Sequence, residues 1–334
     1  MSMAFSGNAE QQIQIRGMVL QFITEQSGLN VADEYAIIEK FLFGYVDSPE
    51  TFKSYRREIE RFLQWCYLEQ KCLLIEVDRT LFAAYLQYAF SPPPEVVAKK
   101  VVPRFIQQAD TFIMNPSWRP YVFKTPKNMP CNNDSSIPYM MNNSAKKALF
   151  AGLSTFYTYL QQEDYIAKNP VVLLRQKNRM VSRTQTQHIT RRLSDMQWHY
   201  MIQTIQQYVD QHSKYERHLF LLSAFYLLGV RISELSDTPL YSPTMGDFAP
   251  DKNGLWWFRT IGKGNKIREI AVPDALLVAL KRYRLSRGLC ALPLRNEHTP
   301  LIENLKSHGG LKIRQIRTII QECFNLAACA LEQA

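Results

Sequence analysis

The sequence lacks a hydrophobic run long enough to cross a bilayer as a helix, which takes about 20 apolar residues. Its longest apolar stretch, at 219–230, is interrupted by Ser223 and predicts a buried helix. The first residues, MSMAFSGNAEQQ, lack the basic segment and apolar core of a signal peptide. The six cysteines are scattered and form no Cys-x-x-Cys pair, which favours reduced thiols. These absences predict a cytoplasmic protein with no membrane partner.

The motifs of nucleotide, metal and nucleophilic sites are missing too. Lys263 in the stretch GKGNK is not followed by Ser or Thr, so the stretch is not a phosphate-binding P-loop. His298 and His308 have no second ligand at metal spacing, and no His-Glu-x-x-His occurs. There is neither a Gly-x-Ser-x-Gly elbow nor a Cys/His pair of useful spacing. We therefore expect no metal and no cofactor.

Apolar and basic residues are plentiful. Hydrophobic residues make up 46% and aromatic residues 12% of the sequence, which excludes a disordered or fibrous protein. The length of 334 residues suggests two domains. The 40 Lys and Arg residues exceed the 30 Asp and Glu residues and give a net charge of +10, a balance that suits an anionic partner.

Positive charge is concentrated between Tyr165 and Ser194, a segment with seven basic residues and no acid. Few apolar residues follow Leu174, so we place a basic linker at 175–190. Two interpretations are open: a solvated linker, or a strand that crosses a phosphate backbone. The basic residues are Lys168, Arg175, Lys177, Arg179, Arg183, Arg191 and Arg192.

The first half of the sequence predicts helices. Two are expected at 8–26 and 33–43, mostly within an N-terminal extension at 1–44. A clearer amphipathic helix begins at Pro49, after Ser48 as its cap. Lys53, Arg56 and Arg57 lie on a face separate from the apolar stripe, which an ordinary amphipathic surface helix explains as well as a binding surface does.

A proline-rich segment at 91–143 interrupts the helical domain that we place at 45–174, and we expect it to be an insertion with little regular structure. The helix that follows has Ser144 as its predicted cap. Lys146 and Lys147 lie in its first turn, beside free N–H groups, where they would form a phosphate site unless their placement is chance.

The second half, at 191–334, combines helices with a hairpin. Helices are predicted from Ser194 or Asp195, around the apolar stretch, and at 274–287 and 312–331. The period changes at 255–261 and 267–272, which predicts two strands joined by a Gly-Lys-Gly-Asn turn. The expected fold class is therefore mainly α with a small antiparallel β-hairpin or sheet.

Two basic residues are candidates for chemistry. Arg231 follows a largely apolar stretch, so its guanidinium needs a partner, and Glu234 at i+3 on the same helical face could hold it. Lys263 lies at the hairpin tip between two glycines, with Lys266 and Arg268 nearby. The alternatives are an internal ion pair and a solvated lysine.

Several segments of the sequence resemble the tyrosine recombinase family of phage integrases and chromosome-dimer recombinases. LGVRISEL, followed by TIGKGNKIREIAVP, is similar to part of the family's catalytic domain, and RRLSDMQW resembles its opening. TFKSYRREIERFLQWC and SAKKALFAGLSTFYTYLQQEDYIAKNP resemble the first and last helices of its core-binding domain. The resemblance runs from about residue 45 to 334 in the family's order, without the insertion.

The resemblance implies a C-shaped clamp around duplex DNA, built from a helical core-binding domain and an α/β catalytic domain. In the family, a tyrosine attacks a backbone phosphate and forms a 3′-phosphotyrosine without metal or nucleotide. It implies that Arg231 stabilises charge on the phosphate, that Lys263 protonates the leaving 5′-oxygen, and that Glu234 supports Arg231. Family members work as tetramers on two duplexes, but we expect this chain to be monomeric without DNA.

The DNA contacts that we expect are mostly to phosphates, which give affinity rather than sequence choice. They are Lys53, Arg56, Arg57, Lys146, Lys147, Arg175, Lys177, Arg179, Arg183, Arg191, Lys266 and Arg268.

The sequence departs from the family after the hairpin, where a His-x-x-Arg motif and then the nucleophilic tyrosine belong. The last tyrosine is Tyr283, and the string HITR at 188–191 precedes Arg231. We therefore expect a recombinase truncated before these motifs, which binds DNA without cutting it in cis. The alternative is a non-cleaving DNA-binding paralogue that occupies recombination or regulatory sites. A basic structural protein is the third class.

Overall fold

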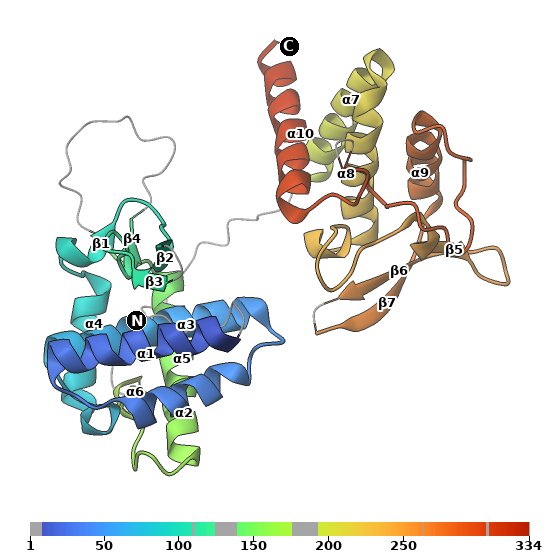
Figure 1. Ribbon diagram of the computed structural model, residues 1–334. Coiled ribbons are helices and arrows are strands. Elements are labelled where there is room, and N and C mark those ends of the chain that lie inside the picture. Colours follow the sequence, from blue (N-terminus) through green and yellow to red (C-terminus); the bar gives the residue numbers. More distant parts are fainter. Residues whose placement is uncertain are drawn as a thin grey trace. The chain divides into compact units, whose positions relative to one another are not determined.

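The chain folds into two compact units, Met1–Gln187 and His188–Ala334 (Figure 1). The computed structural model describes residues 9–108, 111–123, 139–175, 193–262, 264–304 and 307–333. Most of the predicted basic linker at 175–190 lies outside the described residues, so the linker stays a prediction. No helix in these described ranges is long and apolar enough to span a membrane.

The first unit is a helical bundle. Its helices are α1 (Ala9–Ser27), α2 (Ala32–Phe43), α3 (Pro49–Gln64), α4 (Arg79–Phe90), α5 (Asn143–Gln162) and α6 (Pro170–Arg175), and a π-helical turn, Trp65–Gln70, extends α3. Aromatic side chains fill the core: the ring of Phe62 meets those of Tyr85 and Tyr157 edge-on. At Gly152 of α5, an added Cβ would lie 3.4 Å from the Tyr55 ring of α3, so the small residue lets these two helices approach closely.

Helix caps explain where two of these helices begin. Asp78 accepts a hydrogen bond from the N–H of Leu81 at 2.7 Å and caps α4. At α5 the cap is Asn142, which accepts from the N–H of Ala145 at 2.8 Å, and not the predicted Ser144. Asn and Ser cap equally well, so composition alone does not choose between neighbouring positions.

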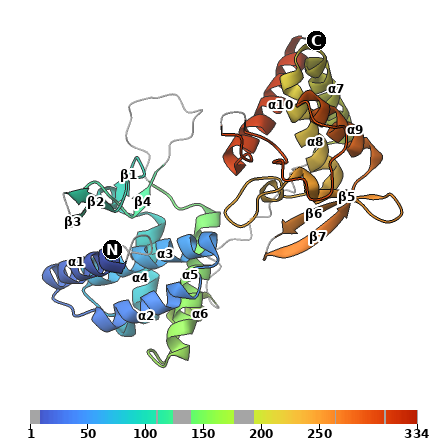
Figure 2. The ribbon, with the colours of Figure 1, turned by 45° about the vertical axis from the view of Figure 1, so that its right-hand side comes forward.

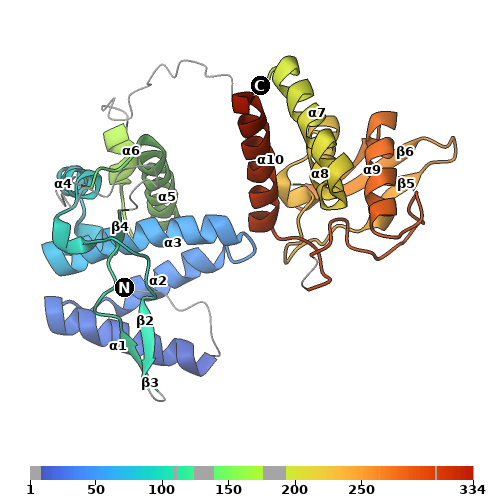
Figure 3. The same ribbon diagram turned by 90° about the horizontal axis from the view of Figure 1, so that it is seen from above.

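The predicted insertion contains more regular structure than expected. A short 3₁₀ turn, Pro94–Val96, leads into β1 (Val97–Ala98), which pairs in parallel with β4 (Tyr121–Val122). Between them, β2 (Phe105–Gln108) and β3 (Thr111–Met114) form an antiparallel pair. Figure 3 shows β3 beside α1, where Met114 lines a small apolar hollow with residues of α1. Residues 124–138 lie outside the described ranges.

The described part of the second unit combines four helices, which pack on one another, with a three-stranded sheet. The helices are α7 (Asp195–Gln211), α8 (Glu216–Leu228), α9 (Asp274–Ser286) and α10 (Ile313–Gln333). The sheet is antiparallel in the order β5 (Phe248–Pro250), β6 (Trp256–Gly262), β7 (Lys266–Ala271). In Figures 1 and 2 the β6–β7 hairpin extends from one end of this unit.

Burial patterns place α8 at the centre of the second unit. Its side chains are buried on nearly every side between His218 and Ala224, as the apolar stretch predicts. The ring of Phe220 stacks on that of Tyr283 from α9, and Phe248 packs on Phe258 from the sheet. The predicted fold class, mainly α with a small antiparallel sheet, is confirmed.

Candidate functional site

The sequence suggested that Arg231 lies on a helix, and this is wrong. Helix α8 ends at Leu228 because Gly229 adopts the left-handed conformation, with φ +59°. Arg231 is extended and precedes a single 3₁₀ turn, Ile232–Glu234. The Glu234 carboxylate reaches back to accept the N–H of Arg231 at 2.7 Å, so the turn closes on itself.

Glu234 joins two arginines from different elements. Its side chain is fully buried, and its Oε1 accepts a hydrogen bond from Nη1 of Arg231 at 3.1 Å. Its Oε2 accepts from Nη2 of Arg268, on β7, at 2.8 Å. One buried carboxylate therefore fixes both guanidinium groups, and we call these three residues the two-arginine site.

The hairpin strands set the position of Arg268. Arg268 lies opposite Thr260 in the β6–β7 register, and the Thr260 hydroxyl donates to the backbone oxygen of Glu234 at 3.3 Å. An added Cβ on Gly262 would lie 3.2 Å from Oε1 of Glu234 and 3.5 Å from Nε of Arg268. A side chain at position 262 would therefore crowd the carboxylate, which explains the glycine there.

The two-arginine site carries an uncompensated positive charge. Two guanidinium groups face one carboxylate, and their side chains remain 58% and 40% exposed for Arg231 and Arg268. Within the described residues, Nε of Arg268 is buried without a hydrogen-bond acceptor. Exposed N–H donors with a net charge of one form a site for an anion such as a phosphate.

The tip of the β6–β7 hairpin is described except for Lys263. Gly264 and Asn265 take positive φ values of 78° and 59°, which turn the chain from β6 into β7. Lys266 begins β7 and is exposed. Lys263 lies outside the described residues, so its predicted role is untested.

The basic residues predicted on α3 are all engaged in ion pairs. Lys53 pairs with Glu50 at 3.0 Å and stays largely exposed. Nε of Arg57 donates to the buried Glu58 at 2.7 Å. Arg56 lies 3.8 Å from Glu60 and is mostly buried, and that burial lowers its pKa. These side chains therefore face acids as well as solvent.

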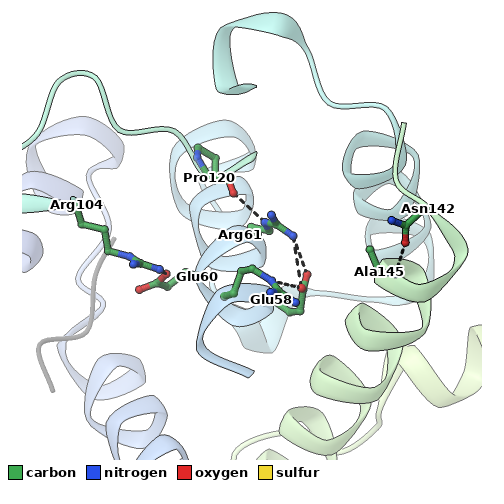
Figure 4. Close-up of polar contacts among 8 residues, drawn as sticks. Glu58, Glu60, Arg61, Arg104, Pro120, Asn142 and Ala145 are labelled. Atoms are coloured by element: carbon green, nitrogen blue, oxygen red, sulfur yellow. Dashed lines mark hydrogen bonds and ion pairs between the residues drawn. The ribbon is translucent and has the colours of Figure 1, made fainter. Parts of the chain in front are cut away.

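Sequence reasoning missed the residues that neutralise the buried acids of α3. Arg61 donates to Glu58 at 3.3 Å and to the backbone oxygen of Pro120 at 2.9 Å (Figure 4). Arg104, before β2, pairs with Glu60. Pro120 and Arg104 both belong to the insertion, so these bonds fasten it to α3. No local signal could reveal these two bonds, because their partners are 44 and 59 residues apart. The i,i+3 spacing of Glu58 and Arg61, in contrast, was a local signal that the sequence offered.

The lysines at the start of α5 lie two positions later in the helix than predicted, because the cap is Asn142 and not Ser144. The helix begins at Asn143, and its cap satisfies the N–H of Ala145. Nζ of Lys146 lies 4.3 Å from the ring centroid of Phe90, a cation–π contact. Lys147 is exposed. Neither lysine's predicted phosphate contact is tested by this geometry.

The structure brings none of the remaining predicted DNA contacts to the two-arginine site within its described residues. Arg175 is the last residue of α6. The others lie outside the described residues: Lys177, Arg179, Arg183 and Arg191.

No family model and no curated protein matches this sequence. Among solved structures, the XerH site-specific recombinase bound to a palindromic difH substrate, a post-cleavage complex, aligns with a TM-score of 0.51 and 14% identity, covering 98% of this chain and 74% of that chain. The chain has the tyrosine recombinase fold. 

Two other recombinase structures are similar to a lesser degree. XerH in a pre-cleavage complex with its difH substrate gives a TM-score of 0.48 at 13% identity over 83% of this chain. An integrase from mycobacterium phage Brujita gives 0.28 at 11% identity over 89% of it. The chain spans 62% of the length of the pre-cleavage XerH chain and 74% of the phage integrase.

Within this tyrosine recombinase fold, Tyr283 is unsuited to act as a nucleophile. It is 3% exposed, and its ring stacks on Phe220 with the centroids 5.0 Å apart. Burial raises the pKa of its hydroxyl, which also accepts a hydrogen bond from the N–H of Glu303 at 3.4 Å. The last tyrosine of the sequence is therefore a core residue of the second unit.

Proposed function

We propose that the protein is a site-specific recombinase of the tyrosine type that binds duplex DNA and seats a backbone phosphate on the two-arginine site. The observation that carries this proposal is the pairing of Arg231 and Arg268 on the buried Glu234, with donors left exposed. Support for duplex DNA as the ligand comes from XerH, which was solved on its difH substrate. The predicted cytoplasmic location is part of this proposal.

Each residue has a distinct role in the proposed reaction. Arg231 donates to the phosphate oxygens, where negative charge builds as the phosphorus is attacked. Arg268 supplies a second positive charge beside the phosphate, and Glu234 fixes the direction of both guanidinium groups. Lys263 protonates the leaving 5′-oxygen as a general acid. The chemistry of a phosphotyrosine needs no hydrolysable cofactor.

The first unit contributes affinity rather than chemistry. Exposed Lys53 and Lys147 and the partly exposed Arg57 would contact phosphates without reading bases. The basic residues at 175–191 extend this contact along the duplex. Binding of this kind releases counterions, so its affinity falls steeply with salt.

Fluorescence anisotropy with a labelled duplex tests this proposal. With six phosphate contacts, affinity should fall about 1,000-fold between 50 and 200 mM salt. Arg231→Ala should weaken binding and lower the salt slope by about one. Arg295→Ala is the matched control, because Arg295 is exposed in the same unit and changes the same charge. Equal losses in both variants, or a flat salt response, would show that the two-arginine site is not a phosphate site.

A second candidate function is occupancy of recombination or regulatory sites without cleavage. The observation that favours it is the burial of Tyr283 against Phe220, which leaves this tyrosine unable to reach a phosphate. The two functions differ in the mass of the protein made from its native gene. A mass well above 38.9 kDa supports a recombinase with a further segment that carries the nucleophile. A mass of 38.9 kDa together with salt-sensitive DNA binding supports occupancy.

A further inference from the structure

The end of α3 brings two cysteines together. The π-helical turn Trp65–Gln70 is closed by Lys71, which adopts the left-handed conformation with φ +51°. The chain then reverses, and the N–H of Cys72 donates to the backbone oxygen of Cys66 at 3.0 Å. This closure resembles a Schellman motif, in which the residues at the two ends of the bond commonly touch through their side chains.

The backbone bond also limits the separation of the two residues. Since the path from one Cα through C=O and N–H to the other is short, their Cα atoms lie no more than about 6.9 Å apart. Disulfides span Cα separations of roughly 4.4–6.8 Å. The turn therefore limits the two Cα atoms to separations compatible with a disulfide.

The two thiols differ in environment. Cys66 is fully buried. Cys72 is partly exposed. Hydrogen bonding to the Cys66 side chain lowers the pKa of Cys72, although burial and the carboxylates of Glu76 and Glu34 act in the opposite direction. Burial raises the pKa of Cys66 well above the usual range. The accessible sulfur is therefore the one that favours the thiolate.

The other described cysteines lack this arrangement. Cys290 and Cys329 are exposed, and Cys323 is buried with its pKa raised to about 12 by burial. Within the described ranges, the backbone bond that closes the turn at Cys66 and Cys72 is specific to this pair of cysteines. Cys131 lies outside those ranges.

We propose that Cys66 and Cys72 form a dithiol site that hydrogen peroxide oxidises to a disulfide. The Cys72 thiolate attacks one peroxide oxygen, the O–O bond breaks, and a sulfenic acid and one water form after protonation. The Cys66 sulfur then attacks the sulfenic sulfur, the S–O bond breaks, and a second water leaves with the Cys66 proton. In total, two thiols lose two electrons and hydrogen peroxide gains them. This site is independent of the proposed recombinase function.

Trypsin provides a direct assay of this disulfide. Cleavage after Arg61, Lys71 and Arg79 separates Cys66, in peptide 62–71, from Cys72, in peptide 72–79. The reduced full-length chain is treated with hydrogen peroxide, alkylated with iodoacetamide, digested and analysed by mass spectrometry. We expect the two peptides to appear joined, with Cys72 consumed about tenfold faster than Cys290 or Cys329.

Three variants separate the steps. Cys72→Ser should abolish the joined peptides and leave Cys66 free for alkylation after denaturation. Cys66→Ser should stop the reaction at a sulfenic acid on Cys72, which dimedone traps. Cys290→Ser, which removes an exposed cysteine from the other unit, should leave the joined peptides unchanged.

The native chain alone decides the outcome if Cys66→Ser fails to fold. Joined peptides that form before the exposed cysteines react support the site. Alkylation of both Cys66 and Cys72 after peroxide has consumed Cys290 and Cys329 would overturn it, as would disulfides that join different chains in their place.

Discussion

Replacing Glu234 with glutamine removes the charge that holds the two-arginine site together, with almost no change in shape. The carboxylate accepts three hydrogen bonds: from the N–H of Arg231, from its Nη1, and from Nη2 of Arg268. An amide keeps one acceptor oxygen and turns its NH₂ group towards a donor. At least one guanidinium therefore loses its partner.

The expected cost follows from the burial of the carboxylate and the exposure of its partners. A hydrogen bond to a charged group stabilises a protein by about 1.5–3 kcal/mol when both partners are buried. Arg231 and Arg268 are 58% and 40% exposed, so water replaces much of what each loses. We expect Glu234→Gln to lower the unfolding free energy of the second unit by about 2 kcal/mol, and its Tm by about 4–8 °C.

Hydrogen exchange read by mass spectrometry assigns this loss to the right unit. Peptides from α8 and β6 report on the second unit, and peptides from α3 serve as an internal reference. Glu269→Gln is the matched control, because Glu269 is exposed on β7 next to Arg268 and carries the same charge change. If Glu234→Gln exchanges like Glu269→Gln, Glu234 does not organise the two arginines.

Three further predictions concern packing, pH and assembly. An added Cβ at Gly246 would lie 2.5 Å from the backbone nitrogen of Glu297, so Gly246→Ala should cost about 2 kcal/mol in denaturant unfolding, whereas Gly17→Ala, in open space on α1, should cost nothing. Burial raises the pKa of Glu297, but hydrogen bonds from Arg284 and other partners outweigh it, so the pKa is lowered. The stability that the Glu297 carboxylate contributes is therefore present above about pH 4.5 and is lost as the pH falls through the depressed folded pKa. In thermal melts over a pH series, Glu297→Gln should make Tm depend less on pH at the acid end. Light scattering without DNA should give the mass of one chain, 38.9 kDa, and a stable tetramer would contradict this.

Regular periodicity made much of the second unit predictable. The strands expected at 255–261 and 267–272 are β6 and β7 displaced by a single residue, because period-two patterning and a glycine turn both act locally. The helix expected at 274–287 is α9, which ends at Ser286. Strand β5 was missed, since its three residues, Phe248–Pro250, become a strand only by pairing with β6.

The environment of Arg231 was predicted with the right partner and the wrong backbone. Glu234 does bind Arg231, but through a 3₁₀ turn and not along a helix. Gly229 was the available signal, because glycine commonly ends a helix in the left-handed conformation. The second arginine on Glu234 lies 34 residues away, and only folding of the hairpin brings Arg268 there.

The same comparison explains why a count of basic residues overstates the cationic surface of α3. Arg57 and Arg61 share the buried Glu58, and Arg56 and Arg104 share Glu60, so each acid offsets part of the charge that the sequence displays. Burying a carboxylate without such partners would be costly, so these arginines are needed for folding before any ligand arrives. The two-arginine site has the same ratio of two arginines to one acid but a different exposure. The guanidinium groups of Arg231 and Arg268 stay open to solvent, while Arg56, Arg61 and Arg104 are mostly buried. The positive charge of the two-arginine site is therefore accessible to a ligand, whereas most of the arginine charge around α3 is not.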